Sequence, residues 1–461
     1  MNHLIKQLQK ENAQLFAENQ ELKRKVELLT AGITELEEKL ALYQKTSTLE
    51  KKPLNFIKQN SHYRKKPGQP KGHKGTSWFR PKEADETVDL TLSCCPNCSH
   101  PLLKPFGIRD HFVEELVPAS VVVTNYRHYR YRCPSCKKIV ESSAPLEIPN
   151  ARLGPKALLT AAYLKYGLSL PYRKVTLALS NLCGLQVTPG GLAQAIQRSA
   201  HFFQTEISFI KESLRKSNFV HSDETGWRLG YRNHWLWVFT TDKVTLYQIN
   251  KSRSHKVVKK ILGKNYKGTL ISDFYTAYNP LPYKKQKCLA HLFRELAECK
   301  TKAEEFLSFR KKLSRLLHDG MRLAHRREEL EKDLFLRKQK HIESRLMQII
   351  STFYQDPDCQ RLSNRLRKHK EAIFCFLREA DVEPTNNRAE RALRQNVISR
   401  KVSFGNYSTS GATTQTIITS LIETCRQQKK DFIQYGLEFI QHHLSGNTTS
   451  LLTPTFPIRS P

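Results

Sequence analysis

The stretch "PTNNRAERALRQNVISRKVSFGNYS", residues 384–408, holds a single acid, Glu390, in a strongly basic segment. Two interpretations of this acid are open. Asn387 and Glu390 have the N-x-x-E spacing of a capping box, in which the acid bonds the first amides of a helix. Alternatively, Glu390 binds a metal ion while the basic residues contact phosphates, since Asn387, Glu390 and Arg394 share one face of a helix. The basic residues of the stretch are Arg388, Arg391, Arg394, Arg400 and Lys401.

The composition of the whole chain points to a large, basic protein. Its 461 residues are too many for one simple domain, and 39% of them are apolar, which is enough for real cores. The net charge of +33 predicts a polyanionic partner, most often nucleic acid, because cationic side chains release counterions from phosphates. A solvated basic surface is the alternative. The chain has no apolar run of about 18 residues, so we expect no membrane span. Its charged, periodic N-terminus predicts a cytoplasmic, nucleoid-associated protein.

Residues 1–45 have the seven-residue leucine repeat of a coiled coil. Asparagine at two of the a positions is typical of a parallel two-stranded coil, where it fixes the register. We expect this zipper to make the protein a homodimer or a higher oligomer; an amphipathic helix that packs within its own chain is the alternative. The d positions are Leu8, Leu15, Leu22, Leu29, Leu36 and Tyr43, and the a positions are Ile5, Asn12, Asn19, Val26, Ile33 and Leu40.

Residues 46–90 follow as a basic, flexible arm. Between Lys51 and Gly75 the chain has eight Lys/Arg and no acid, together with prolines and glycines that prevent a packed core. We expect this arm to follow DNA phosphates, and an inert solubilising linker is the alternative. The residues expected to contact phosphates are Arg64, Lys65, Lys66 and Lys71.

Residues 91–145 contain two C-P-x-C motifs separated by 34 residues of strand-like sequence. Four thiolates at this spacing fit one tetrahedral Zn²⁺ per chain in a small ribbon. One C-x-x-C pair would also fit a redox site, but two pairs favour zinc, and disulfides are not expected in a cytoplasmic protein. Cys94 is expected to be a bystander, and His100 has a less suitable spacing. The zinc ligands are predicted to be Cys95, Cys98, Cys133 and Cys136.

Residues 146–205 are predicted to be helical. One helix ends before Leu170-Pro171, Gly184 stops the next, and Thr188-Pro189 starts a third. Two short helices around a glycine-containing turn are compatible with a helix-turn-helix, whose last helix enters the DNA major groove. Helical domains that do not bind DNA have the same pattern, so both interpretations stay open.

Strand patterns dominate from about residue 216. Breaks at Gly230-Tyr231 and Thr241-Asp242 predict three antiparallel strands, and a crossover leads to a further strand that ends at Asp273. We expect a core at residues 206–440 with a charged helical insertion at about 295–378. Residues 441–461 form a C-terminal tail.

Three acids stand at unusual positions in this core. Asp223 lies in an apolar strand, where a charge is costly unless it is paired or coordinated. Alternation puts Asp223 on one face with Thr225, and Glu224 on the other. Asp273 ends a later strand, and Glu390 starts a helix. This order matches the carboxylate triad of the ribonuclease-H-like fold, where three acids bind two Mg²⁺ ions for attack on a phosphodiester.

Motifs along nearly the whole chain resemble the transposases of the insertion sequence sixty-six family. Its core is resembled by "HSDETGWR" (221–228), "ISDFYTAYN" (271–279), "CLAHLFREL" (288–296) and "PTNNRAERALRQNVISRKVSFGN" (384–406), its basic arm by "KKPGQPKGHKG" (65–75), and its helical region by "GPKALLTAAYLKYGLSLPYRKV" (154–175). The resemblance implies a multidomain α+β protein. Its parts would be an N-terminal coiled coil, a zinc ribbon, a helical DNA-binding region and a ribonuclease-H-like DDE core with a helical insertion.

The same resemblance implies a DNA transposase of a bacterial insertion sequence. Such an enzyme cleaves at the element's ends and transfers the 3′-hydroxyls into target DNA. Carried over by position, the catalytic, magnesium-binding acids are Asp223, Asp273 and Glu390. The expected partners are the element's ends, the target DNA and accessory proteins of the same element. A non-catalytic DNA-binding regulator and a nuclease that does not join strands are the alternatives.

Five further residues near these motifs are considered for the site. Cys288 and His291 in "CLAHLFRE" lie either near the active site or in the core, as a buried cysteine and a hydrogen-bonded histidine, and we leave them out of the catalytic set. Trp227, Trp235 and Trp237 are expected to be sheet core, with base stacking as an alternative for Trp227 alone.

Overall fold

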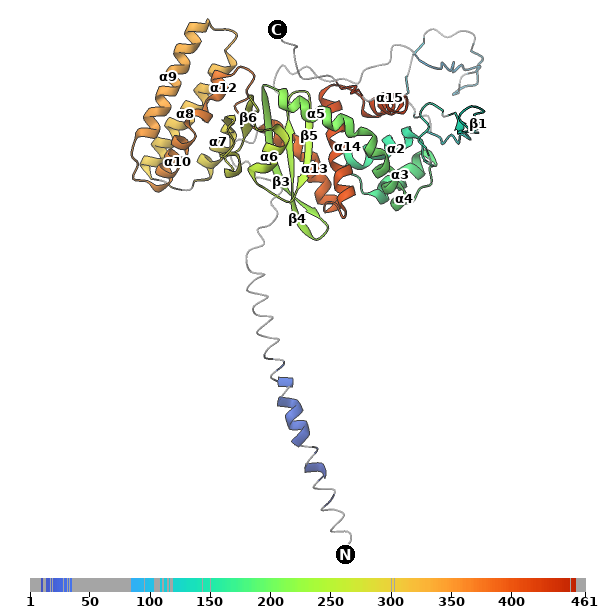
Figure 1. Cartoon of the computed structure of the whole chain (residues 1–461), viewed down its shortest axis with the longest axis horizontal. Helices are drawn as coiled ribbons and strands as arrows, with labels where there is room; N and C mark the ends of the chain where they lie inside the picture. The colour runs from blue at the N-terminus through green and yellow to red at the C-terminus, as the bar shows by residue number, and fades with distance from the viewer. Residues whose placement is uncertain are drawn as a thin grey trace, which may run out of the picture. The chain divides into compact units, whose positions relative to one another are not determined.

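The computed structural model describes most of the chain from residue 84 to residue 452 and part of an N-terminal helix (Figure 1). The basic arm, including Arg64, Lys65, Lys66 and Lys71, lies outside the described residues, as does Cys95. Two compact units, residues 1–114 and 115–461, are described each by itself. The gaps after residue 84 are at 95, 103–107, 110–111, 114–115, 117–118, 143, 150, 300, 302 and 448, and the described N-terminal residues are 10, 14–16, 18, 20–27, 29–30, 32 and 34.

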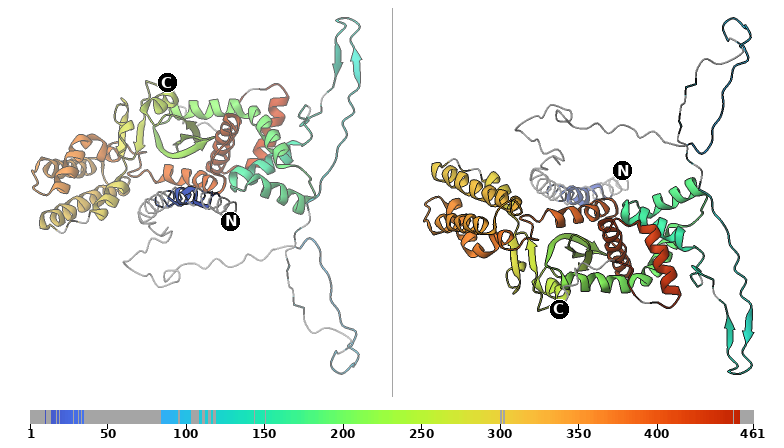
Figure 2. Two further views of the ribbon diagram at one scale, coloured as in Figure 1. Left: turned by 90° about the horizontal axis from the view of Figure 1, so that it is seen from below. Right: turned by 90° about the horizontal axis from the view of Figure 1, so that it is seen from above.

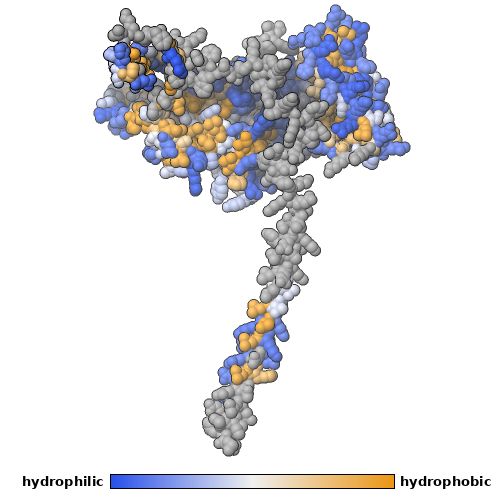
Figure 3. All heavy atoms as spheres, turned by 180° about the vertical axis from the view of Figure 1, so that it is seen from behind, coloured by the Kyte–Doolittle hydropathy of each residue, from blue (hydrophilic) through white to orange (hydrophobic). Residues whose placement is uncertain are grey.

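The described residues between 10 and 34 are all helical, as the leucine repeat predicts. Leu15, Leu22, Val26 and Leu29 belong to the predicted seam, and their exposed fractions lie between 56% and 67%. Figure 3 shows apolar side chains at the surface of this segment. The other predicted seam positions fall outside the described residues, so the pairing of two such helices stays a prediction.

The second unit is a mixed α/β structure built on a five-stranded mixed sheet. The strand order is β5-β4-β3-β6-β7, with β3, β4 and β5 antiparallel and β3, β6 and β7 parallel. The three predicted antiparallel strands are confirmed, and β7 was missed because three of its four residues are lysines. The strands are β3 (Phe219–Leu229), β4 (Arg232–Thr240), β5 (Thr245–Asn250), β6 (Thr269–Ser272) and β7 (Lys284–Lys287).

Helices lie at both ends of this sheet (Figures 1 and 2). In all views the helical insertion, α8 to α12, lies at one end of the sheet, and α2 to α4 lie at the other. A separate two-stranded hairpin, β1 (Arg130–Arg132) and β2 (Ile139–Glu141), precedes the helices. The helices are α2 (Pro155–Ala162), α3 (Tyr172–Cys183), α4 (Pro189–Ala200), α5 (Gln204–Lys216), α6 (His255–Leu262), α7 (Leu289–Glu298), α8 (Glu304–His325), α9 (Lys332–Ser351), α10 (Pro357–Lys368), α11 (Lys370–Ile373), α12 (Cys375–Arg378), α13 (Asn387–Ser403), α14 (Thr409–Gln427) and α15 (Phe432–Leu444). The shorter helical turns are η1 (Tyr163–Gly167, a π-helix), η2 (His201–Phe203) and η3 (Thr276–Tyr278).

Local sequence signals set the ends of several of these helices. Gly184 ends α3 in the left-handed conformation, with φ of 72°, where a side chain would be strained. Thr188 caps α4, and its hydroxyl accepts the Gly191 amide at 3.2 Å. The helices predicted from these signals are confirmed. Among the described residues, no helix combines the length and the apolar character needed to cross a membrane.

Small and apolar side chains place α13 on the sheet. Ala389, Ala392 and Leu393 are buried against β3, β4 and β5. Because two of these side chains are single methyl groups, the helix backbone approaches the strands closely. The helix positions at 389, 392 and 393 lie beside Glu390, so this packing fixes where Glu390 stands over the sheet. Their partners in the same cluster are Trp227, Leu236, Val238 and Tyr247.

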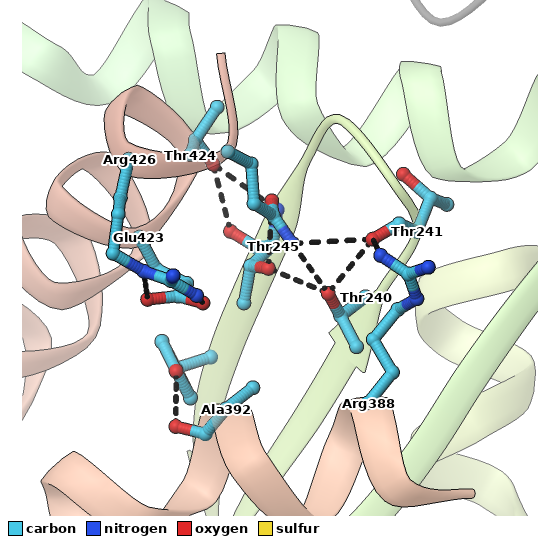
Figure 4. A network of polar contacts seen from close by, with 10 residues as sticks. Thr240, Thr241, Thr245, Arg388, Ala392, Glu423, Thr424 and Arg426 are labelled. Atoms are coloured by element: carbon cyan, nitrogen blue, oxygen red, sulfur yellow. Dashed lines mark hydrogen bonds and ion pairs between the residues drawn. The ribbon is translucent and has the colours of Figure 1, made fainter. Parts of the chain in front are cut away.

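A polar network at the β4–β5 turn ties α13 and α14 to the same strands (Figure 4). The Thr240 and Thr245 hydroxyls are 2.7 Å apart, and the Thr245 amide donates to Thr424 Oγ1 at 3.1 Å. In α13, the Ala392 carbonyl accepts the Tyr247 hydroxyl at 2.6 Å. These bonds are buried, so α13 and α14 together with β3, β4 and β5 form one frame for the site.

Candidate active site

Two of the predicted acids belong to neighbouring parallel strands, Asp223 within β3 and Asp273 directly after β6. β3 and β6 pair with His221 opposite Ile271, and each acid follows its paired residue by two positions. β6 ends at Ser272, so Asp273 leaves the sheet at its carboxyl end beside the middle of β3. The strand pairing therefore brings together acids that are 50 residues apart in sequence.

The surroundings of Asp223 disfavour the ionised form of its carboxyl group. Burial and, after it, the charges of Glu224, Asp273 and Glu390 raise the pKa of Asp223 to about 7. The Glu224 amide donates to Asp223 Oδ1 at 2.8 Å and opposes the shift. Like charges at short range disfavour ionisation, and a bound cation removes that penalty. All three predicted acids therefore contribute to one negative locus.

A buried lysine holds the strand end that carries Asp273. Lys287 Nζ donates to the Asp273 carbonyl at 2.6 Å and to Ser272 Oγ at 3.3 Å. The Lys287 side chain is fully buried, and burial lowers its pKa to about 8. Asp273 Oδ1 also accepts the Tyr275 amide at 2.9 Å. Sequence reasoning missed Lys287, because nothing in a lysine-rich strand marks which lysine points inward.

The start of α13 decides between the two interpretations of Glu390. The N-cap residue is Asn386, and the helix has no side-chain cap. The capping-box interpretation of Asn387 and Glu390 is therefore wrong. Asn386 is buried, and its side chain bonds the sheet instead of capping the helix. Side-chain Nδ2 donates to the Ser222 carbonyl at 3.0 Å, and Oδ1 accepts from His221 Nδ1 at 3.2 Å. This link fastens the beginning of α13 to the strand that carries Asp223.

Cys288 and His291 lie beside Glu390 rather than in the core alone. Their ligand atoms and a Glu390 carboxylate oxygen all lie within 4.8 Å of one another. Cys288 is buried, burial raises the pKa of its thiol, and its Sγ accepts the Asn386 amide at 3.1 Å. His291 Nδ1 is 3.9 Å from Glu390 Oε1. Both residues therefore lie close to one of the predicted catalytic acids, which was one of the two expectations for the "CLAHLFRE" motif.

The basic residues of the 384–408 stretch divide into two groups. Arg391, Arg394 and Lys401 are exposed. Arg388 donates to Glu383 at 2.5 Å and is half-buried, whereas Arg400 donates to Thr225 Oγ1 at 3.2 Å and to the Gly226 carbonyl. These two arginines hold the chain's own loops and strands in place. DNA contact by all five stays a prediction.

The three tryptophans of the sheet differ in burial. Trp237 is fully buried, as expected of sheet core. Trp227 is buried and donates its indole N–H to Asn406 Oδ1 at 2.8 Å, so base stacking by Trp227 is ruled out. Trp235 is half-buried, and the Arg253 guanidinium lies 4.2 Å from its ring centroid.

The two cysteine motifs share a local backbone conformation. A turn covers residues 96–98 in the first motif and 134–136 in the second, and the next residue in each, Ser99 and Lys137, has φ of 58°. Amides of Cys136 and Ser135 donate to the Cys133 sulfur and lower its pKa. Amides that point at a cysteine sulfur favour the thiolate, which is the metal-binding form. The second motif, at Cys133 and Cys136, therefore has the local form of a metal-binding knuckle.

Comparison with known proteins places the chain among transposases. The sequence model of the "Transposase IS66 family" matches residues 150–414. That of the "zinc-finger binding domain of transposase IS66" matches residues 93–137, which include all four predicted zinc ligands.

Curated relatives come from Sinorhizobium fredii (strain NBRC 101917 / NGR234) and are named as uncharacterized proteins. One, y4hP, is 23% identical over 400 residues, covering 76% of this chain and 70% of its own length. Another, y4qI, is 23% identical over 363 residues, covering 69% of this chain and 65% of its own length. A third, y4jD, is 21% identical over 400 residues, covering 79% and 76% respectively. These relatives carry no activity over to the chain.

Proposed function

Because the chain belongs to the IS66 family of transposases, we propose that it cleaves the ends of a bacterial insertion sequence and joins the 3′-hydroxyls to target DNA. The observation that carries this proposal is the convergence of Asp223, Asp273 and Glu390 from three separate segments of the chain. The charges of Asp273 and Glu390 both act on Asp223.

The residues present fit the magnesium ions that this chemistry uses. Carboxylate oxygens are the ligands that Mg²⁺ prefers, and Glu390 Oε1 is a buried atom that has no hydrogen-bond partner in the part of the chain that the structure describes. When bound by the three acids, two Mg²⁺ ions would activate a water or a 3′-hydroxyl and stabilise the leaving oxygen. The protein's part is positioning: Lys287 holds the chain at Asp273, and Asn386 fastens the helix of Glu390 to the strand of Asp223.

The strand arrangement supports a ribonuclease-H-like core as part of the proposal. Three antiparallel strands are followed by two parallel ones, and the central β3 carries the first acid. The third acid lies on α13, which packs on β3 and β4 beyond the helical insertion. We keep the domain boundaries of the sequence analysis as part of this proposal.

The remaining parts are proposed to bind DNA and to assemble the complex. The zinc-finger match supports zinc binding by the four cysteines. The net charge of +33 and the exposed Arg391 and Arg394 support contacts with phosphates. The exposed leucines of the N-terminal helix support dimerisation through the zipper.

The test is a cleavage and joining assay on the full-length protein with Mg²⁺ and labelled DNA that carries the element's own ends. We expect cleaved and joined products from the unaltered chain, and neither product from Glu390→Gln, since a lost ligand disorganises the metal pair. Asp242→Asn removes an exposed acid in the β4–β5 turn and is the matched control. Wild-type rates in Glu390→Gln would disprove the assignment, and cleavage without joining would make the protein a nuclease.

A further inference from the structure

Three donor atoms of different chemistry meet beside the proposed catalytic acids. The Cys288 sulfur, a His291 ring nitrogen and a Glu390 carboxylate oxygen lie within 4.8 Å of one another. Cys288 is the N-cap residue of α7, and His291 follows it by three residues, so both lie on one face of that helix. Glu390 lies in the first turn of α13. The beginnings of two helices therefore face each other across this cluster.

Backbone bonds hold the two helix beginnings together. The Leu289 amide donates to the Pro384 carbonyl at 3.0 Å, and the Asn386 amide donates to Cys288 Sγ at 3.1 Å. Both bonds join α7 to the segment just before α13. The three donor atoms are thus brought together by rigid elements and not by a loop, which is how a ligand site keeps its geometry.

Two of the three donor atoms have no hydrogen-bond partner among the described residues. His291 Nδ1 and Glu390 Oε1 are buried atoms that make no hydrogen bond within the described part of the chain. They are 3.9 Å apart, whereas a charge-assisted N–H···O bond is about 2.7–2.9 Å long. A buried polar atom without a partner destabilises the folded state. A cation between the two atoms would satisfy both.

We propose that Cys288, His291 and Glu390 form a site for a borderline divalent cation of the zinc class. Thiolate and imidazole select such ions, whereas Mg²⁺ prefers an all-oxygen set. Ligand atoms at about 2.0–2.3 Å from zinc lie within about 4.6 Å of each other, so a small closure of the side chains completes the set. The His291 and Glu390 side chains are 30% and 35% exposed, which leaves a route for the ion and an open coordination position.

This site goes beyond the proposed transposase reaction, because it assigns two ligands and an ion class that the acid triad does not include. It shares Glu390 with the triad. An ion held by Cys288 and His291 would fix the orientation of that carboxylate beside Asp223. Cys288 belongs to this site alone and Asp223 to the triad alone, so variants of these two residues test the site and the reaction separately.

Cobalt is the probe, because a cysteine ligand gives Co²⁺ a thiolate charge-transfer absorption in the near ultraviolet. The full-length protein is purified with zinc in its cysteine ribbon and is treated with a weak chelator until one zinc per chain remains. Co²⁺ is then titrated in, and zinc and cobalt per chain are counted by mass spectrometry. We expect one zinc and one cobalt, with the charge-transfer band. Cys288→Ser should lose the band, and His291→Gln should weaken cobalt binding by at least about tenfold.

Two controls and a second variant keep the outcome decisive. Cys299→Ser, at the opposite end of α7, and Asp223→Asn should both keep the band. Asp223→Asn should do so while losing DNA cleavage, which separates this site from the proposed reaction. A band that persists in Cys288→Ser with zinc still at one per chain overturns the proposal, as does the binding of no cobalt. If Cys288→Ser does not fold, His291→Gln decides, and unchanged cobalt affinity in that variant overturns the proposal.

Discussion

Asp223 and Glu224 are neighbours on β3, yet the two faces of the strand treat them differently. On the face away from α13, Glu224 is matched by the protein itself. Arg253 Nη2 lies 3.0 Å from Glu224 Oε1, and the Tyr278 hydroxyl donates to Glu224 Oε2 at 2.5 Å. The Arg253 guanidinium in turn lies 4.0 Å from the ring centroid of Tyr275. Burial and the charge of Asp273 raise the pKa of Glu224, and the contacts with Tyr278 and Arg253 oppose that shift.

On the face that carries α13, the acids are set against one another. Burial raises the pKa of Asp223, and so do the charges of Glu224, Asp273 and Glu390, whereas a hydrogen bond from the Glu224 backbone amide opposes the shift. Glu390 Oε1 has no hydrogen-bond partner in the described part of the chain. A buried charge with partners in the protein contributes to the fold, whereas a buried charge without such partners is available to bind a ligand. The difference between the faces separates a structural acid from a catalytic one.

The largest expected effect is on DNA cleavage by variants of these two neighbours. Asp223→Asn should abolish Mg²⁺-dependent cleavage, because the amide is a poorer ligand and a negative charge is lost from the site. Glu224→Gln should retain cleavage at temperatures where it is folded. Initial rates on labelled element ends, with DNA affinity measured alongside, give the comparison. Loss of cleavage in a folded Glu224→Gln chain would place both faces in the active site.

A second, smaller effect concerns the free energy of unfolding. Arg253→Gln should lose about 1–3 kcal/mol, because it leaves the buried Glu224 carboxylate without its cation. Glu224→Gln should lose less, because the Arg253 side chain that it leaves unmatched is 38% exposed. The double variant should lose less than the sum of the two, since the groups interact directly. Urea unfolding midpoints measure all three. Additive losses would show that the Glu224–Arg253 pair does not stabilise the fold.

The smallest effect is a pH dependence at a third buried acid, remote from both faces of the strand. Glu206 in α5 accepts hydrogen bonds from Ser450 at 2.5 Å and from the Leu451 amide at 3.0 Å, but burial still raises its pKa above the ordinary 4.5. The folded state disfavours the ionised form, so the chain loses stability from this group as pH rises above about 4.5. Glu206→Gln lacks this loss.

The stability of Glu206→Gln relative to the unaltered chain should therefore increase with pH. Urea midpoints at pH 4.5 and pH 7.5 would measure it, with Glu212→Gln on the exposed side of α5 as the control. A relative stability that falls as pH rises would mean that the hydrogen bonds outweigh burial at Glu206.

Much of the site was predictable because its signals are local. Alternation along β3 put Asp223 and Thr225 on one face and Glu224 on the other, and the structure has them so: Thr225 bonds Arg400 from α13, and Glu224 bonds Arg253. Neighbouring side chains in a strand must point to opposite faces. The turn residues that end helices and the spacing of the cysteines are signals of the same short range.

The sequence by itself therefore determined which residue types stand on which element, and the order of the three acids along the chain. Only the tertiary structure decided which side chains meet. Lys287 is buried under Asp273 because β7 pairs with β6, and Asn386 bonds the sheet instead of capping its helix. Glu390 and Cys288 are about one hundred residues apart, and a helical insertion separates them. Their contact depends on how two helices pack, and no local pattern in a single sequence records such packing.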